Sequence, residues 1–290
     1  MKKYVSIVLA IAIMAASISV LASCVNPILD TSKLAGIESE TERTILENES
    51  SKSYFTYEIS KNDKITITAY SGGTDLHDIV VPEKIGEREV TAIAADAFKG
   101  QSNVKSVTLP KSVTSIGNYA FSGCYMLQKV TAPAVSEIGV GAFYNCNKLT
   151  DFDNGTERPL TSIGKYAFFG CESLANPFTE EACEGSSLKT IGDYAFYGCN
   201  ALDNVHIPKS VEKIGSYAFY NCSSLTSVYL GDTLKVTQIT DEATGNILET
   251  IYPIGERAFT VSTALTVSCV EGSYAHTYAA QNFIKYVFVN

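Results

Sequence analysis

Two acidic residues separated by a single position are the first candidates for chemistry. Asp151 and Asp153 lie in the sequence Asp-Phe-Asp-Asn-Gly, and a pair of carboxylates can hydrolyse a glycosidic bond or coordinate a calcium ion. The spacing and the closing Glu of an EF-hand loop are missing, so calcium is a minor alternative to a polar strand end. There is also no nucleophile motif of the Gly-x-Ser-x-Gly kind and no phosphate-binding loop. We therefore expect no catalytic residue, no metal ion and no cofactor, and keep a glycan-active enzyme as an alternative.

The eight cysteines and three histidines are the next candidates, for metal binding, disulfides or catalysis. No two cysteines have the Cys-x-x-Cys spacing of a zinc site, and the histidines lie far apart in the sequence. Five cysteines each follow a Phe by three residues: Cys124, Cys146, Cys171, Cys199 and Cys222. Side chains in such a regular series point the same way, which predicts small buried apolar residues rather than disulfides. A disulfide between Cys183 and Cys269 stays open.

Cys24 stands in a different context. The chain begins with Met-Lys-Lys, and residues 5–21 are almost entirely apolar and small, which is typical of a secretory signal peptide rather than a membrane helix. The sequence Leu-Ala-Ser-Cys that ends at Cys24 resembles the processing box of bacterial lipoproteins, in which the Cys becomes the lipid-modified first residue. We therefore predict a signal peptide over residues 1–23, lipid attachment at Cys24, and an exported protein held to a membrane by its acyl chains. The absence of an acidic residue directly after Cys24 favours the outer membrane.

Composition limits the partners of the chain. It contains 22 Lys and Arg against 31 Asp and Glu, a formal net charge of −9. Nucleic-acid binding needs clustered basic residues, so we expect no nucleic-acid partner. Residues 24–53 are rich in Ser, Thr, Glu and Lys without sustained periodicity, and such a segment cannot bury enough apolar surface to offset its ordering entropy. We expect it to be a flexible tether behind the lipidated Cys.

An internal repeat fills most of the remaining chain. The phrase Ile-x-x-x-Ala-Phe occurs with Phe at positions 98, 121, 143, 168, 196, 219 and 259. A unit of about 23 residues is too small to bury a core alone, so stacked units must share one. Each unit predicts a short strand that ends at a Pro, as at Pro133, and a short helical turn that carries Ala, Phe and Cys on one side. The recurrent Phe, Ile and Leu should then form one continuous apolar column.

The repeat resembles the BspA-type leucine-rich repeat of bacteria, with the pattern L-x-x-V-x-I-P-x-x-V-x-x-I-G-x-x-A-F-x-x-C. The resemblance implies a β-rich α/β repeat solenoid, a leucine-rich repeat horseshoe with a parallel concave sheet and helical turns on the opposite face. The array would span residues 90–265, between an N-terminal β cap over 54–89 and a C-terminal α/β cap over 266–290. The chain departs from the pattern in a Glu-rich insert that ends near residue 187, and again over residues 231–253.

Residues that point outward from the concave sheet are the candidate binding site. Strand side chains alternate between the two faces, so the outward positions should form two parallel rows along the array. The candidates are Ser106, Thr108, Lys129, Thr131, Asp151, Asp153, Asn204, His206, Ser227 and Tyr229. Aromatic residues two before and one after the repeat Phe form a second stripe, which we expect mainly to cover the core and which would be a contact patch if exposed.

We interpret the chain as a non-catalytic surface or periplasmic lipoprotein whose repeats bind other macromolecules. The family resemblance implies adhesion, with a protein or glycan ligand of host matrix, mucus or other bacterial cells. Contact with the membrane would come through the lipid anchor only. Two alternatives stay open: a glycan-active enzyme that uses the region of Asp151 and Asp153, and a structural envelope spacer without a specific ligand.

Overall fold

The computed structural model describes residues 43–48, 53–72, 77–157, 159–178, 180–240, 247–259 and 264–289. These residues belong to one unit of the chain, Glu40–Asn290. The predicted signal peptide, Cys24 and most of the predicted tether lie outside the described residues. Within the described part of the chain, no helix has the length and apolar character needed to cross a membrane.

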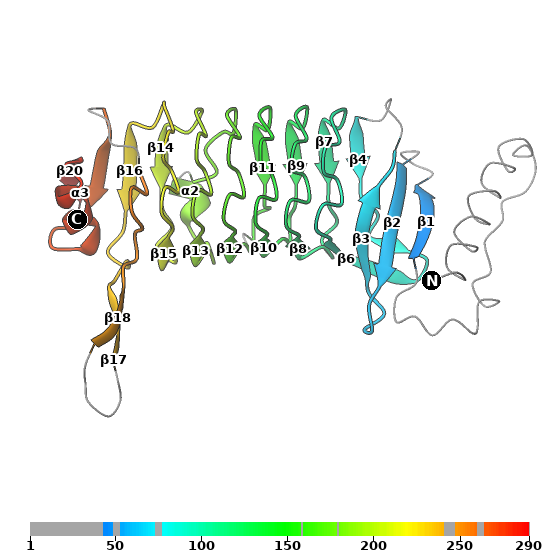
Figure 1. Ribbon diagram of the computed structural model, residues 1–290, viewed down its shortest axis with the longest axis horizontal. Coiled ribbons are helices and arrows are strands. Elements are labelled where there is room, and N and C mark those ends of the chain that lie inside the picture. The colour runs from blue at the N-terminus through cyan, green and yellow to red at the C-terminus, as the bar shows by residue number, and fades with distance from the viewer. Residues whose placement is uncertain are drawn as a thin grey trace, which may run out of the picture. The chain divides into compact units, whose positions relative to one another are not determined.

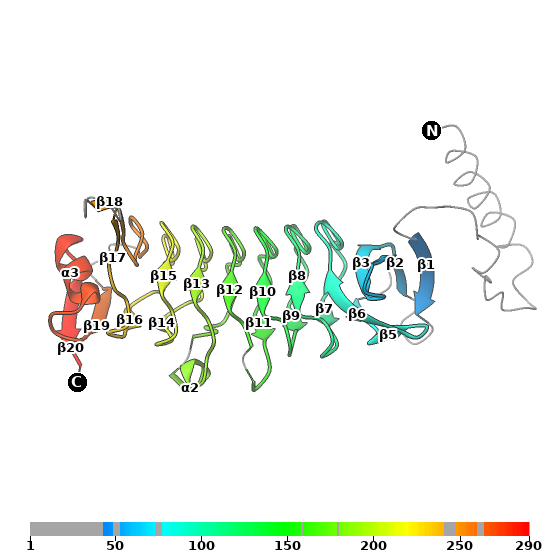
Figure 2. The same cartoon turned by 90° about the horizontal axis from the view of Figure 1, so that it is seen from below.

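The repeats stack side by side in chain order, and their strands form two separate ladders (Figures 1 and 2). The first, which we call the long-strand ladder, contains the predicted strands and consists of two four-stranded parallel sheets. The sheet nearer the N-terminus has the order β11-β9-β7-β4, with the strands β4 (Asp78–Val80), β7 (Ser106–Thr108), β9 (Lys129–Thr131) and β11 (Asp151–Asp153). The other sheet has the order β14-β16-β19-β20, with the strands β14 (Asn204–His206), β16 (Ser227–Leu230), β19 (Thr266–Cys269) and β20 (Lys285–Phe288).

The second ladder, which we call the short-strand ladder, was not predicted. It runs from β6 to β15 in parallel pairing and uses the Ile of each repeat phrase and the residue before it. Its members are β6 (Arg88–Ile93), β8 (Ser115–Ile116), β10 (Glu137–Ile138), β12 (Ser162–Ile163), β13 (Thr190–Ile191) and β15 (Lys213–Ile214). A two-residue strand leaves no alternation in the sequence, which is the signal by which strands are recognised.

The Gly that follows this Ile allows neighbouring coils to approach closely. A Cβ atom at Gly117 would lie 2.5 Å from the backbone nitrogen of Ala95 and 2.6 Å from the carbonyl carbon of Ala94, both in the preceding coil. Such distances are far inside van der Waals contact, and backbone atoms have little freedom to move away. The Ile-Gly pair of the repeat is therefore explained by packing between coils.

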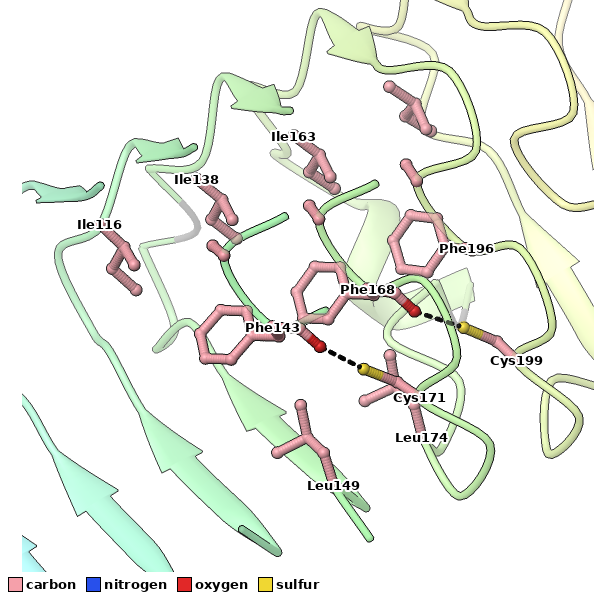
Figure 3. Packing of buried hydrophobic residues seen from close by; sticks show 14 of the residues in the cluster. Ile116, Ile138, Phe143, Leu149, Ile163, Phe168, Cys171, Leu174, Phe196 and Cys199 are labelled. Atoms are coloured by element: carbon pink, nitrogen blue, oxygen red, sulfur yellow. Dashed lines mark hydrogen bonds between the residues drawn. The ribbon is translucent and has the colours of Figure 1, made fainter. Parts of the chain in front are cut away.

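The repeat Phe side chains form the predicted column. Successive rings from Phe98 to Phe259 stack nearly face to face, with centroids 4.8 to 5.3 Å apart. Figure 3 shows Phe143, Phe168 and Phe196 following one another in this column, beside a parallel file of Ile side chains. Each ring is essentially inaccessible to solvent, and burying a side chain of this size contributes about 1.5–3 kcal/mol. The column therefore makes a large contribution to the stability of the array.

The segment that carries Ala and Phe is a series of turns rather than the short helical turn we expected. Ser122 N donates to Tyr119 O within the coil, whereas Phe121 N donates to Ala142 O of the next coil at 2.7 Å. Tyr119 takes a positive φ of 55°, which no helical turn contains. Some backbone N–H groups therefore donate within their own turn, and others donate to the neighbouring coil. The predicted side-chain directions are nevertheless right, since Phe121 and its neighbours on that side are buried.

The repeat cysteines form the predicted buried ladder, and none of them forms a disulfide. Each Sγ donates to the carbonyl oxygen of the Phe in the preceding coil, at 3.1 to 3.2 Å. Two of these contacts, from Cys171 to Phe143 and from Cys199 to Phe168, are drawn in Figure 3. Burial raises the pKa of the Cys222 thiol from 9.0 to about 12. Cys183 and Cys269, for which a disulfide had stayed open, are not joined by one.

The two ends of the array are closed by non-repeat elements. At the N-terminal end, β2 (Ser53–Ile59) and β3 (Ile65–Tyr70) form an antiparallel hairpin, and β5 (Lys84–Ile85) pairs with β6. A further strand, β1 (Arg43–Asn48), pairs with β2 inside the range 24–53 expected to be a tether. At the C-terminal end, α3 (Tyr274–Gln281), capped by Ser273, precedes β20, as predicted.

The insertion over residues 231–253 forms an arm that leaves the solenoid. Strands β17 (Thr237–Thr240) and β18 (Ile247–Ile251) pair antiparallel and project away from the row of coils (Figure 1). Immediately after the arm, Ile254 bridges to Ile214 and Phe259 bridges to Phe219. The seventh repeat phrase therefore resumes the stack in the predicted register.

Candidate functional site

The register of the long-strand ladder fixes the positions of the ten candidate binding residues. In the first sheet, Lys129 lies between Ser106 and Asp151 in one row, and the Thr of β9 lies between Thr108 and Asp153 in the other. In the second sheet, Asn204 is paired with Ser227, and His206 is paired with Tyr229. The structure thus brings the candidates together in two groups, one on each sheet. We call them the first patch and the second patch.

The sequence pattern missed residues that extend both patches. Strand β4 places Asp78 beside Ser106, and β19 places Thr266 beside Ser227. Both strands belong to coils that deviate from the repeat pattern, so their outward positions could not be assigned by alignment with other copies. The strand pairing in the structure identifies both residues directly.

Polar contacts in the first patch run along the rows. Lys129 Nζ lies 3.0 Å from Asp151 Oδ2, and Ser106 Oγ donates to Asp78 Oδ1 at 2.6 Å. A hydrogen bond and the charge of Asp151, together with the charge of Asp153, raise the pKa of Lys129. The Asp153 side chain accepts a hydrogen bond from Gly155 N at 2.8 Å. Both carboxylates are exposed, so their surroundings are those of surface charges rather than of a buried general acid.

The second patch is less charged and contains a ring pair. The imidazole of His206 stacks on the ring of Tyr229, with centroids 5.5 Å apart and an interplanar angle of 22°. The Ser227 hydroxyl donates to the Asn204 side-chain oxygen. Both rings are half-buried, so part of the pair is exposed to solvent.

The two patches do not form one surface, because the long-strand ladder is interrupted between them. The coil between β11 and β14 contributes no strand to the long-strand ladder. It carries Asn176-Pro-Phe178 followed by the short helix α2 (Glu180–Cys183), which projects from the row of coils (Figure 2). Pro lacks the N–H that a ladder requires. The two rows that we expected to run through the whole array are therefore broken at this coil.

A cavity of about 350 Å³ opens at the interruption. Its wall includes Asp151, Asp153 and Phe152 of β11, together with Phe168 and Phe196 of the buried column. The cavity was not predicted from the sequence. The only signal was the departure from the repeat pattern at Asn176-Pro-Phe178, which indicates a break but not the space that the break leaves.

The aromatic stripe is a stack whose ring faces are already occupied. Tyr144, Phe169, Tyr197 and Tyr220 stack in one file, and Tyr166, Tyr194 and Tyr217 in another. Centroids within the files are 4.8 to 5.8 Å apart, and these residues are half-buried. Because each ring covers the face of the next, the stripe offers only ring edges to solvent. This arrangement agrees with the expectation that it mainly covers the core.

The three histidines serve separate local contacts. His77 Nδ1 lies 2.8 Å from Asn103 O, and His276 packs between the rings of Tyr286 and Phe288. Among the described residues, no group of three or more His, Cys, Asp or Glu side chains has a geometry that would hold a metal ion.

Comparison with known proteins identifies the repeat. The model of a family described as "BspA type Leucine rich repeat region" matches residues 91–185 and 178–266, with six copies. These ranges span more than half of the chain. No relative is found among curated proteins.

Solved structures of bacterial repeat proteins resemble this fold. A leucine rich cell surface protein from Faecalibacterium prausnitzii A2-165 is 23% identical, with a TM-score of 0.52 over 80% of this chain and 72% of that protein. The T. pallidum leucine-rich repeat protein is 25% identical, with a TM-score of 0.42 over 80% of this chain and 95% of that protein. The pneumococcal vaccine antigen PcpA is 12% identical, with a TM-score of 0.30 over 85% and 99%.

Proposed function

The chain belongs to the BspA-type leucine-rich repeat family, and from this premise we propose that it is a non-catalytic, exported protein that binds another macromolecule through its long-strand ladder. The observation that carries the proposal is the contrast between the two faces of each strand. Val130 is fully buried, whereas Lys129 beside it is exposed and aligned with outward polar side chains from neighbouring coils. Extended surfaces of this kind are what repeat proteins use to bind partners.

The partner that we propose is a protein or glycan on a host or bacterial surface, which makes the protein an adhesin. The polar character of both patches supports this, because aligned hydroxyl, amide and charged groups can bind either class of ligand. The half-buried ring pair of His206 and Tyr229 adds the type of aromatic contact that is enriched in interfaces.

Anchoring through Cys24 is the second part of the proposal, and its support is the N-terminal sequence alone. Acyl chains on Cys24 would hold the protein to a membrane, because each buried CH₂ group contributes about 0.8 kcal/mol. Metabolic labelling of cells with a radioactive fatty acid tests this directly. The wild-type chain should incorporate label and Cys24→Ser should not, and equal labelling of both would refute the anchor.

Binding of the purified chain to immobilised matrix proteins, mucin and intact bacterial cells tests the adhesion proposal. We expect saturable binding to at least one of these surfaces, weakened by the pair His206→Ala and Tyr229→Ala. The matched control is Tyr220→Ala, which removes an aromatic ring from the other side of the same coil. No saturable binding to any surface would favour a structural spacer. Glycan hydrolysis that is abolished by Asp153→Asn would favour an enzyme instead.

A further inference from the structure

The cavity at the interruption lies against an open sheet edge. Ala175 N still donates to Thr150 O at 2.9 Å, but the chain then turns away from β11. Phe178 O instead accepts from His206 N of β14 at 2.8 Å. Strand β11 is therefore the last strand of its sheet, and the space where the next strand would lie is the cavity.

The floor of the cavity is apolar. Phe152 is only half-buried, whereas the Val at the same position in β7, β9, β14 and β16 is fully buried. Its ring lies edge-on to Phe143 and Phe168, with centroids 5.6 and 5.5 Å away. Most other lining residues are also apolar, among them Leu160, Leu174, Leu188 and Pro208. An apolar side chain placed there would complete the packing that the missing strand leaves open.

The mouth of the cavity is acidic. Among the lining residues that the structure describes, only Asp151 and Asp153 are ionisable, and both are exposed. The only ion-pair partner found for them in the described chain is Lys129, which contacts Asp151 from the opposite edge of β11. A ligand that enters along the open edge would therefore meet two carboxylates, and a cationic ligand is favoured.

The occupied edge of β11 shows what kind of strand fits beside it. There β9 sets Lys129 against Asp151, Val130 against Phe152, and Thr131 against Asp153. A strand on the open edge would face the same alternation, because side chains of paired strands at one level point to the same face. Its outer positions would meet the carboxylates and its inner position would meet Phe152 and the cavity.

We propose that this cavity binds an extended peptide segment with a basic–apolar–basic sequence, supplied by a partner protein. The segment pairs with β11 as an added strand, places its apolar side chain beside Phe152, and sets its basic side chains opposite Asp151 and Asp153. The inference deepens the proposed function and rests on it, because the cavity opens at the outward side of the same ladder.

Fluorescence anisotropy of a labelled, end-blocked Thr-Lys-Phe-Lys-Thr peptide with the full chain tests the proposal. Saturable binding is expected, and it should weaken as salt screens the carboxylates. Replacement of both Lys by Glu, or of Phe by Ser, should abolish it. Equal binding of all three peptides would overturn the proposal.

Backbone methylation of the peptide tests strand pairing separately from charge. Successive N–H groups of a strand point to opposite edges, so only one of two alternate methylation patterns blocks the edge that faces β11. One pattern should lose binding and the other should keep it. If both patterns bind like the parent peptide, no strand is added.

The protein side is tested with the double variant Asp151→Asn and Asp153→Asn. We expect the peptide to bind about tenfold more weakly, as two exposed charge pairs together would give. The matched control is Glu137→Gln, an exposed carboxylate on the short-strand ladder that does not line the cavity, and this variant should bind the peptide normally. An unchanged affinity of the double variant would overturn the site.

The two proposals fail in different ways. If the chain binds matrix protein, mucin or cells but not the peptide, the cavity site is refuted and the adhesion proposal stands. If the chain binds none of these surfaces, the adhesion proposal is refuted. Binding of the peptide alone would then show the site but not a surface protein that carries such a segment.

Discussion

Cys171 Sγ lies 3.1 Å from the carbonyl oxygen of Phe143, one coil earlier in the solenoid. The contact joins two neighbouring coils inside the core, and it recurs at each repeat Cys. The thiol therefore has two roles, since it fills a small apolar space and adds a second hydrogen bond to a carbonyl oxygen that already accepts from the backbone N–H of Cys146. A hydroxyl or methyl group can replace only one of these roles.

Replacement of Cys171 by Ala should destabilise the array by about 2 kcal/mol, because it removes a buried sulfur and leaves the Phe143 carbonyl without this donor. Urea unfolding followed by circular dichroism measures the change. Cys183→Ala, in the insert outside the repeat ladder, is the control and should cost less. Equal losses for the two variants would show that the ladder position has no special weight.

Stability should fall at alkaline pH because of the buried thiols. The pKa of Cys222 is raised from 9.0 to about 12, since burial penalises the thiolate. A raised pKa in the folded state gives a contribution that is complete below pH 9 and lost as the pH rises toward 12. At pH 10 the cost is about 1.4 kcal/mol for one such thiol. The urea midpoint of Cys222→Ala should therefore drop less between pH 8 and pH 10 than that of the wild type; parallel drops would contradict this.

The close approach of coils predicts a large effect of Gly117→Ala. The new methyl group would meet backbone atoms of Ala94 and Ala95 at 2.5 to 2.6 Å, and we expect a loss of about 3 kcal/mol or more. Gly100→Ala is the matched control, because Gly100 has a φ of +72° but open space around it. Its cost should be only the strain of the left-handed conformation, about 1 kcal/mol. Thermal unfolding of the two variants compares them directly.

The Phe column predicts a graded response to truncation of neighbouring rings. Phe168 stacks between Phe143 and Phe196 at 5.1 Å on each side and is buried, so Phe168→Ala should cost about 3–5 kcal/mol. Phe169, the next residue, lies in the half-buried aromatic stripe. Phe169→Ala should cost clearly less in the same urea titration. A reversed order would mean that the stripe, rather than the column, carries the stability.

The sequence predicted those features that repeat with a fixed spacing. Phe121 and Cys124 occur in clear copies at constant offsets, so their burial and shared direction followed from the pattern. The long strands were also predicted, because the apolar Val130 and Ala132 alternate with the polar Lys129 and Thr131. The short-strand ladder was not, since Ser115 and Ile116 are too few residues to show a period.

The candidate site was predicted only as far as the repeat is regular. Alternation assigned Asp151 and Asp153 to the outward side of a strand, and the structure places them there. The cavity beside them depends on the course of the backbone after Ala175. The sequence follows the repeat pattern as far as Leu174, so it gives no sign of that course. Only Pro177 indicates that strand pairing must stop, because Pro has no backbone N–H to donate. This does not reveal how far the backbone moves away from β11.

The arm of β17 and β18 shows how this architecture tolerates growth. Ile214 bridges to Ile254, which lies forty positions later in the sequence, so the coils on either side of the arm pack directly on each other. Extra sequence at this corner therefore leaves the register of later coils intact. We expect this corner to accept other inserted segments. A reporter or an epitope could be placed there without a change in the rest of the solenoid.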